Sequence, residues 1–207
     1  MSIRAIIWDL EGVLLQTRDE DVPTTIAHKL NVPVVKMREA FYSDFNDRVD
    51  KGEFTHDDFM NHVLDYLVLP HDRKTDLLDC FYQDFYIDAG MLADVRAYHQ
   101  HYRTALLSNY SELLRKMLAS NWRMDGAFDQ IVISWEVHMI KPDPDIFHYT
   151  LEKLGCAPEE AIFIDDKAVN VEGARALGMQ AFLFTGREDM NRRIEAILAQ
   201  FKESIPA

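Results

Sequence analysis

Five short apolar runs constrain the fold of this chain more than any other feature of its sequence. They are Ile3–Trp8, Thr104–Leu107, Ile131–Ile133, Ala161–Ile164 and Gln180–Phe184. The runs are largely continuous and rich in Ile, Val, Leu and Phe, with little of the polar alternation that a half-exposed strand shows. Strands buried on both faces have this composition, and they occur in parallel sheets that helices cover on each side.

Amphipathic stretches with a helical period lie between and after the later runs. They are Glu112–Ser120, Asp143–Leu154, Ala168–Leu177 and Glu188–Phe201. The second begins with Asp143 as a predicted N-cap and Pro144 at the first helical position, and Gly155 suits its end. Alternating strands and helices are typical of an α/β fold with right-handed crossovers. The sequence therefore predicts a doubly wound, Rossmann-like parallel sheet.

Residues 16–88 have a different pattern, with no strand-like run. Helical periodicity appears instead at Asp21–Leu30, Val34–Asn46, His56–Leu67 and Asp72–Phe85. Thr55 and Asp58 form the sequence pattern of a capping box at the start of the third of these helices. We therefore predict two domains: an α/β core of residues 1–15 and 89–207, and a helical cap of residues 16–88 inserted after the first strand.

The charge balance of the chain argues against two classes of partner. The 207 residues include 22 Lys and Arg against 35 Asp and Glu, which gives a formal net charge of −13. Such a surface repels nucleic-acid phosphates and the anionic inner leaflet of a membrane. No apolar run approaches the ~18 residues of a membrane span, and Asp9 comes too early for a signal-peptide core. We expect a cytoplasmic protein with no nucleic-acid or membrane partner; the choice between monomer and homodimer stays open.

The two cysteines, Cys80 and Cys156, lie far apart in the chain. Their separation matches neither a metal-ligand spacing nor the dense pattern of a disulfide framework. We therefore expect both side chains to be buried, reduced thiols.

Polar side chains follow the predicted strands, at the edge of the sheet where the strands end. These residues are Asp9, Glu11, Ser108, Asn109, Lys141, Asp165 and Asp166. In doubly wound sheets, ligands bind in the crevice outside this edge. Spacing alone is weak evidence in an acidic chain, since Asp9 also suits a turn and Asp165 and Asp166 also suit helix caps. Several acids that converge on one crevice nevertheless indicate a cation between them, because carboxylates repel one another.

The residue types in this set indicate which ligands the crevice binds. Oxygen ligands favour Mg²⁺, which retains water and accepts the oxygens of a substrate phosphate. Lys141 and Ser108 beside such a cation suit an anionic group, and phosphate is the natural candidate. The residues therefore indicate a Mg²⁺ site that handles a small phosphorylated molecule.

Four stretches at these positions resemble the motifs of the haloacid dehalogenase (HAD) superfamily in order and spacing. They are Asp9–Leu14, Leu107–Asn109, Lys141–Pro142 and Asp165–Asn170. The resemblance covers essentially the whole chain, and the helical insert is similar to the C1-type cap of subfamily I. The segment Lys51–Phe59 resembles part of the cap in the branch that holds alpha-glucose-1-phosphate phosphatases and the phosphatase domain of soluble epoxide hydrolase.

The resemblance implies roles in phosphoryl transfer for four of these residues. Asp9 would be the nucleophile that attacks phosphorus and forms an aspartyl-phosphate, which water then hydrolyses. Ser108, with the amide of Asn109, would hold phosphoryl oxygens. Lys141 would neutralise the phosphate and orient Asp9.

The resemblance also implies how Mg²⁺ is held. The carboxylates of Asp9 and Asp166 would bind the ion directly, together with the backbone carbonyl of Glu11. Asp165 would act through a water molecule, and Asn170 would orient the acids. The cation would allow a carboxylate to approach a dianionic phosphate.

Glu11 is a departure from the pattern that the phosphatases of this superfamily usually show. They carry Asp two residues after the nucleophile, as the acid/base for the leaving group and for water. The extra methylene of Glu11 moves the carboxyl group by about 1.5 Å, and a misplacement near 1 Å can lower a rate about 100-fold. Two interpretations stay open: Glu11 is the acid/base, or its side chain faces solvent and only its backbone carbonyl matters.

We therefore predict a Mg²⁺-dependent phosphomonoester hydrolase that acts through an aspartyl-phosphate on a small phosphorylated metabolite, with a sugar phosphate as one candidate. Three alternatives stay open. A metal-free 2-haloacid dehalogenase would use the same Asp9. Asp165 and Asp166 argue against this alternative, because that subgroup has a segment similar to Ser-Ser-Asn at this place and needs no cation. A low-activity binding or regulatory relative would follow if Glu11 has weakened turnover. A phosphomutase would return the phosphoryl group to a second sugar hydroxyl.

Overall fold

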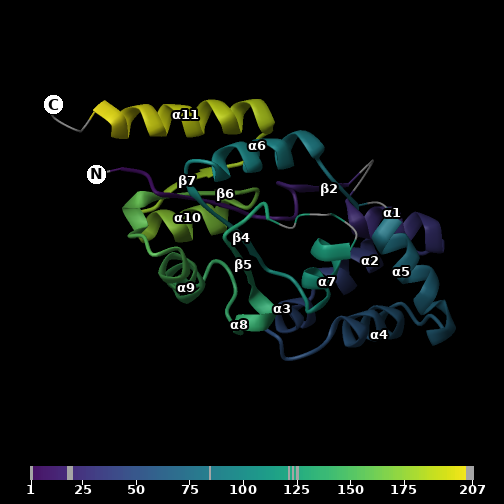
Figure 1. Ribbon diagram of the computed structural model, residues 1–207. Coiled ribbons are helices and arrows are strands. Elements are labelled where there is room, and N and C mark those ends of the chain that lie inside the picture. Colours follow the sequence, from purple (N-terminus) through teal and green to yellow (C-terminus); the bar gives the residue numbers. More distant parts are fainter. Residues whose placement is uncertain are drawn as a thin grey trace.

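The computed structural model describes residues 2–17, 21–83, 85–120, 122, 124 and 126–203. At its centre lies a five-stranded parallel sheet with the strand order β5-β4-β1-β6-β7 (Figure 1). The strands are β1 (Ala5–Trp8), β4 (Arg103–Ser108), β5 (Gln130–Ile133), β6 (Ala161–Asp165) and β7 (Gln180–Leu183). Each coincides closely with one of the five apolar runs, and the predicted α/β fold class is confirmed.

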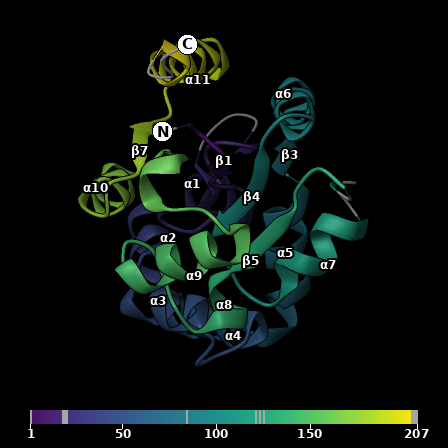
Figure 2. The same ribbon diagram turned by 60° about the vertical axis from the view of Figure 1, so that its left-hand side comes forward.

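Both faces of the sheet are buried beneath helices, which explains why the strands are apolar throughout. The helices that follow residue 88 are α6 (Ala89–His99), α7 (Leu113–Ser120), α8 (Ser134–Val137), α9 (Pro144–Leu154), α10 (Ala168–Ala176) and α11 (Arg187–Glu203). Ile6 and Trp8 of β1 share one cluster of buried residues with α6 and α11, and Ile7 shares another with α9 and α10. Figures 1 and 2 show these two pairs of helices on opposite sides of the strands.

The region between the first and second strands of this sheet is mostly helical. Its helices are α1 (Val22–Leu30), α2 (Val34–Phe41), α3 (Asp44–Asp50), α4 (His56–Tyr66), the 3₁₀ turn η1 (His71–Arg73) and α5 (Lys74–Gln83). The buried cluster that contains Trp8 continues into this region through Met37 and Met60. The helices are therefore packed against the core rather than separated from it.

Two short strands correct the expectation that residues 16–88 contain no strand. β2 (Leu15–Thr17) and β3 (Phe85–Ile87) pair antiparallel, with Leu15 opposite Ile87, where the chain leaves the core and where it returns. Three residues are too few to produce a recognisable alternation of polar and apolar side chains. The predicted helix Asp72–Phe85 is wrong at its end for the same reason, because Phe85 belongs to β3.

One predicted helix of this region is two helices in the structure. The pattern over Val34–Asn46 breaks after Phe41, and α3 begins at Asp44 with Ser43 as an extended N-cap residue. The Ser43 hydroxyl donates to the carbonyl of Ala40 at 2.9 Å, which competes with continuation of the helix. The break matters because α3 then takes a direction of its own.

Helix starts are otherwise close to the sequence predictions. Thr55 Oγ1 accepts from the Asp58 N–H at 3.2 Å and Asp58 Oδ2 accepts from the Thr55 N–H at 2.9 Å, which confirms the predicted capping box of α4. Asp143, Pro144 and Gly155 occupy the predicted ends of α9, although the Asp143 side chain makes no capping hydrogen bond.

Two further findings concern membrane-spanning helices and the cysteines. No helix of the described residues is long and apolar enough to cross a membrane. Cys156 is a free thiol, but it is half-buried rather than buried, because it lies in the turn after α9 and not within the helix. The side chain of Cys80 lies outside the described residues.

Candidate active site

Asp9 stands at the middle of the sheet edge because β1 is the central strand. Trp8 pairs with Leu106 of β4 and with Ile164 of β6, and the Asp9 N–H donates to the Ile164 carbonyl at 2.9 Å. The next residue of β6 is Asp165, which is fully buried. The register of two neighbouring strands therefore brings Asp9 and Asp165 together, although they lie far apart in sequence.

Lys141 joins these two carboxylates. Its Nζ lies 2.6 Å from Asp9 Oδ1 and 2.7 Å from Asp165 Oδ2, and the lysine side chain is 2% exposed. Burial raises the pKa of Asp9 to about 7, against the opposing effect of the Lys141 ammonium. Burial lowers the pKa of Lys141, but the two carboxylates outweigh it and the net shift is upward. The lysine therefore stays charged between its two partners.

The position of Lys141 depends on the side chain of Asn109, just beyond β4. The Lys141 N–H donates to Asn109 Oδ1 at 2.8 Å, and Asn109 Nδ2 donates to the Lys141 carbonyl at 3.0 Å. The ring of Phe163 supports the ammonium from 5.6 Å. The Asn109 side chain is therefore fixed against the backbone of Lys141, and its own backbone N–H is a further donor at this end of β4.

Asp165 is held from its other side as well. Asn170 Nδ2 donates to both of its carboxylate oxygens, at 3.1 and 3.0 Å, and the Lys167 N–H donates to Oδ1 at 2.8 Å. Both donors belong to the start of α10, which follows β6 directly. Asn170 therefore contacts an acid of the site, as an orienting residue must.

Asp166 completes a group of three carboxylates. Asp9, Asp165 and Asp166 each offer one oxygen, and these oxygens all lie within 4.8 Å of one another. Burial, followed by the charge of Asp165, raises the pKa of Asp166. Gly12 makes room for this group, since a Cβ there would lie 2.5 Å from Asp166 Oδ2 and its φ of +80° disfavours other residues. Clustered oxygen donors of this kind fit a hard divalent cation such as Mg²⁺.

Ser108 and Glu11 differ in burial and in their hydrogen-bond partners. Ser108 Oγ is buried and has no hydrogen-bond partner among the described residues, an arrangement that costs about 1–3 kcal/mol unless a ligand supplies one. Glu11 is exposed to the neighbouring pocket, and its side chain is not part of the described group of three carboxylates. The protein around the pocket nevertheless displaces enough water to raise the pKa of Glu11.

A pocket of about 520 Å³ opens between the sheet edge and the helices of residues 22–83, and we call its two sides the core side and the cap side. Its core side includes Glu11, Gly12, Asn109, Tyr110, Ser111, Asp166 and Lys167, and its cap side includes Asp21, Tyr42, Asn46, Asp47, Asp50 and Phe59. The sequence analysis assigned no role to Asn46 or Asp47. A signal was present, because Asn46, Asp47 and Asp50 share one helical face, but the predicted helix stopped before two of them.

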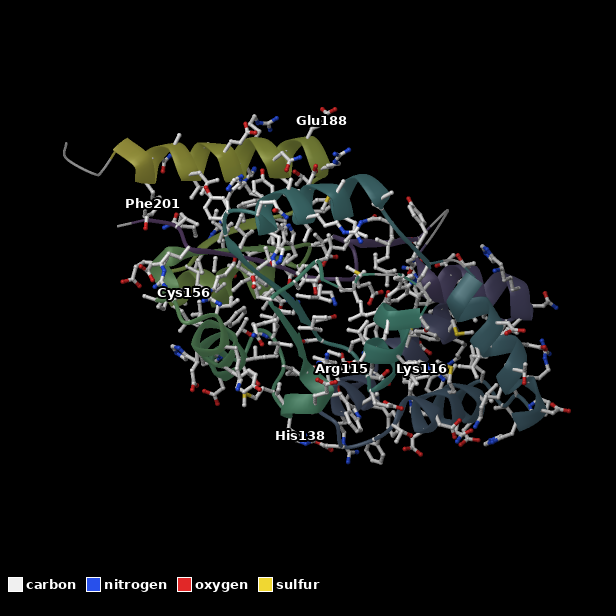
Figure 3. All side chains as sticks on the ribbon, viewed as in Figure 1. Arg115, Lys116, His138, Cys156, Glu188 and Phe201 are labelled. Carbon is white, nitrogen blue, oxygen red and sulfur yellow. The ribbon has the colours of Figure 1, made fainter. Side chains whose placement is uncertain are left out.

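Residues of the core hold the loop that carries this cap side. Trp135 Nε1 donates to the Phe54 carbonyl at 3.0 Å, and His138 Nδ1 lies 2.9 Å from the Lys51 carbonyl oxygen. The Glu112 carboxylate accepts from the His56 N–H at 3.0 and 3.1 Å, at the first turn of α4. Figure 3 labels His138 beside α8, on the side of the molecule where the cap helices lie.

The fold and the site together define a class of protein. The chain matches the haloacid dehalogenase-like hydrolase family over residues 3–178, and it belongs to that family. The predicted superfamily is thus confirmed.

Two curated relatives are similar over most of this chain. Bifunctional epoxide hydrolase 2 of Sus scrofa is 26% identical over 95% of the chain, which corresponds to 39% of that protein. D-ribitol-5-phosphate phosphatase of Bacteroides thetaiotaomicron is 22% identical, over 95% of this chain and 98% of its own. The chain therefore spans well under half of the epoxide hydrolase but nearly all of the phosphatase.

Solved structures agree with the fold. A HAD family enzyme of Bacteroides thetaiotaomicron has a TM-score of 0.79 at 22% identity, over 94% of this chain and 99% of that one. L-2-haloacid dehalogenase of Xanthobacter autotrophicus has a TM-score of 0.66 at 18% identity, over 94% of this chain and 83% of that one. At such identities the likeness establishes the arrangement of the chain and leaves the reaction to be argued from the site.

Proposed function

We propose that this chain is a Mg²⁺-dependent phosphomonoester hydrolase that acts through an aspartyl-phosphate on a small phosphorylated metabolite. The observation that carries this proposal is the buried Lys141 ammonium held between Asp9 and Asp165, with Asp166 beside them. Asp9 is available as a nucleophile, the Lys141 ammonium lies next to it, and Asp165 and Asp166 remain as carboxylates for a metal site. Phosphoryl transfer to a carboxylate needs these three kinds of group close together.

In this proposal Asp9 is the nucleophile. Its free carboxylate oxygen forms a bond to phosphorus as the bond from phosphorus to the leaving oxygen breaks, and the leaving oxygen takes up a proton. Water then attacks the aspartyl-phosphate and releases inorganic phosphate. Lys141 favours the ionised form of Asp9 and offsets the charge of the incoming phosphate.

Asp9 and Asp166 would hold Mg²⁺ directly, with the backbone carbonyl of Glu11, and Asp165 would act through water. When bound, the ion supplies positive charge that stabilises the phosphoryl oxygens. Asp165 meanwhile fixes Lys141, and Asn170 keeps the Asp165 carboxylate in place. The pairing of Asp165 with the lysine agrees with an indirect role at the metal.

Ser108 and the backbone N–H of Asn109 would bind phosphoryl oxygens. The support for Ser108 is its buried hydroxyl, which lacks a partner among the described residues and therefore gains a hydrogen bond when a phosphate arrives. Its position at the end of β4, beside β1, points it to the same edge as Asp9.

Glu11 would be the acid/base that protonates the leaving group. The supporting observation is its position: it follows Asp9 by two residues and lines the pocket into which the leaving group must extend. A glutamate at this place reaches further than the usual aspartate, so the leaving oxygen would lie further from the β1 backbone. We therefore expect Glu11→Gln to lower turnover while Mg²⁺ binding persists.

We also propose that residues 16–88 form the cap domain, and residues 1–15 and 89–207 the core. The pocket between the two regions supports this division. Relatives support the reaction: the phosphatase from Bacteroides thetaiotaomicron acts on D-ribitol 5-phosphate, and structures of a HAD family enzyme from that organism contain magnesium and inorganic phosphate.

The test is hydrolysis of p-nitrophenyl phosphate with Mg²⁺, with EDTA, and by Asp9→Asn. We expect turnover that EDTA abolishes and that Asp9→Asn lowers by at least about 10⁴-fold. Turnover that survives in Asp9→Asn would remove the nucleophile assignment. Release of chloride from chloroacetate without metal would instead establish a dehalogenase, and Mg²⁺ binding without any turnover would favour a regulatory relative.

A further inference from the structure

One helix supplies most of the polar surface on the cap side of the pocket. Asn46, Asp47 and Asp50 of α3 lie one helical turn apart or less, so that all three face the pocket. Opposite them, on the core side, stand Glu11 and Asp166. A substrate whose phosphate lies at Asp9 must therefore place the rest of its structure against α3.

The two acids of this helical face are not tied to a neighbouring side chain. In the part of the chain that the structure describes, no hydrogen bond or ion pair joins the side chain of Asp47 or Asp50 to another group. Two other acids of residues 16–88 are paired: Asp21 with Arg38 at 2.9 Å and Glu53 with Arg48 at 2.6 Å. Asp47 and Asp50, unpaired among the described residues, lie where the leaving group of a substrate would lie.

The pocket as a whole carries an excess of negative charge. Five carboxylates line it, from Glu11, Asp21, Asp47, Asp50 and Asp166, and Lys167 is the lysine in its lining. His56 also lines the pocket but is neutral near pH 7, since burial lowers its pKa to about 4. Burial raises the pKa of Asp50 to about 7, and the charge of Glu11 adds to this shift.

We propose that Asp47 and Asp50 determine specificity by accepting hydrogen bonds from a hydroxyl-bearing leaving group and by repelling a leaving group with a second anionic group. Carboxylates are strong acceptors for hydroxyl donors. Asn46, beside them on the same helix, adds an amide that both donates and accepts, as suits a chain of hydroxyls. The inference rests on the proposed phosphomonoesterase function, because it assigns the remaining part of that substrate.

The test compares substrates that differ only in an anionic group. Glycerol 3-phosphate and 3-phosphoglycerate share a three-carbon chain, and sorbitol 6-phosphate and 6-phosphogluconate share an open six-carbon chain; within each pair a CH₂OH group is replaced by a carboxylate. We expect kcat/KM of the wild type to favour the hydroxyl member of at least one pair by about tenfold or more. In Asp50→Asn and in Asp47→Asn, this ratio should fall at least about fivefold.

Asp44→Asn is the matched control. Asp44 belongs to the same helix, is exposed, and does not line the pocket, so the variant changes net charge equally without altering the pocket wall. Its substrate ratio should equal that of the wild type. Equal ratios in Asp50→Asn and Asp44→Asn, or a wild type that prefers the anionic substrates, would overturn the inference.

Two further outcomes are distinct from these. Absence of Mg²⁺-dependent turnover with p-nitrophenyl phosphate in the wild type defeats the proposed function and the inference together, whereas turnover with an unchanged ratio defeats the inference alone. Phosphoethanolamine serves as the third arm: a kcat/KM at least about tenfold above that of glycerol 3-phosphate would mean that the carboxylates select an amine, and would overturn the assignment to hydroxyls.

Discussion

The two walls of the pocket are held in opposite ways. The core wall rests on Asp9, Lys141 and Asp165, which are buried behind its lining residues and bonded to one another. On the cap wall, Asp47 and Asp50 lie on a single helix and have no side-chain partner among the described residues. The charged groups behind the core wall are therefore preorganised, as charge stabilisation in a reaction requires. The polar groups of the cap wall are instead available to bind a ligand.

The difference also has a consequence for substitutions. A change in the core wall leaves a buried charge without its partner, so it should lower stability and turnover together. A change in the cap wall leaves the buried network intact, so it should alter which substrates bind and how well. Four variants test this contrast, and we describe them from the largest expected effect to the smallest.

Lys141→Ala should have the largest effect. It leaves Asp9 and Asp165 as facing buried acids without a cation, and we expect a loss of about 3–5 kcal/mol in the free energy of unfolding. Turnover of p-nitrophenyl phosphate should fall by at least about 10³-fold. Urea unfolding and steady-state kinetics measure the two effects, with Lys153→Ala, an exposed lysine of α9, as the control.

Should Lys141→Ala fail to fold, Lys141→Met retains most of the length of the side chain and removes the ammonium group. A stable Lys141→Met protein with wild-type turnover would contradict the contrast between the walls, because the ammonium would then have no role in either property.

Asn170→Ala should have an intermediate effect on the core wall. The Asp165 carboxylate loses two contacts, at 3.1 and 3.0 Å, which we expect to cost about 1–3 kcal/mol of stability. Residues that support ligands in this way typically change activity or metal affinity about 10–100-fold, so Mg²⁺ titration of turnover is the measurement. Glu172→Ala, exposed on the same helix, should change neither quantity; an equal effect of both variants would exclude a positioning role for Asn170.

Gly52→Ala tests how the cap wall is held. A Cβ at this residue would lie 2.7 Å from the Trp135 carbonyl oxygen, and its φ is +76°. We expect KM for a hydroxyl-bearing substrate to rise several-fold, with a loss of about 1–3 kcal/mol in stability. Gly126→Ala is the matched control, because Gly126 has a similar φ of +71° and its added Cβ would meet nothing within 4 Å among the described residues, its chain neighbours aside. Identical effects in the two variants would show that backbone strain alone, and not contact with α8, is responsible.

Thr55→Ala should have the smallest effect. It removes the capping hydrogen bond to the Asp58 N–H, which is expected to cost about 1 kcal/mol of stability. Turnover should stay close to that of the wild type, since Glu112 still binds the first turn of α4 through the His56 N–H. Thermal unfolding beside Thr75→Ala, an exposed threonine within α5, measures the difference. A large loss of turnover would mean that the cap wall depends on this helix start far more than its contacts indicate.

The sequence analysis was most successful for the core wall. The apolar runs that form β1, β4 and β6 are recognisable because both of their faces are buried. The polar residues that follow these runs can therefore be identified from the sequence alone. It was least successful at the edges of the cap. β2 and β3 are too short to carry a period, and the start of α3 depends on a local hydrogen bond of Ser43.

The side chain of Asn109 illustrates a second limit. Its position after β4 made it a candidate phosphate ligand, yet its amide binds the backbone of Lys141 on both sides. Nothing in the local sequence announces this contact, because Asn109 and Lys141 meet only when β4 and β5 pair. The function proposed for the Asn109 backbone N–H stays a prediction.

By itself, the sequence determined the α/β class, the family, and the set of acids and the lysine that the strand ends deliver. It did so because burial on two faces and position at a strand end are local properties, written in neighbouring residues. The tertiary structure alone decided that Lys141 is shared between Asp9 and Asp165, and that α3 turns Asp47 and Asp50 toward the pocket. These contacts join residues from distant parts of the chain, and strand register and helix packing fix their distances.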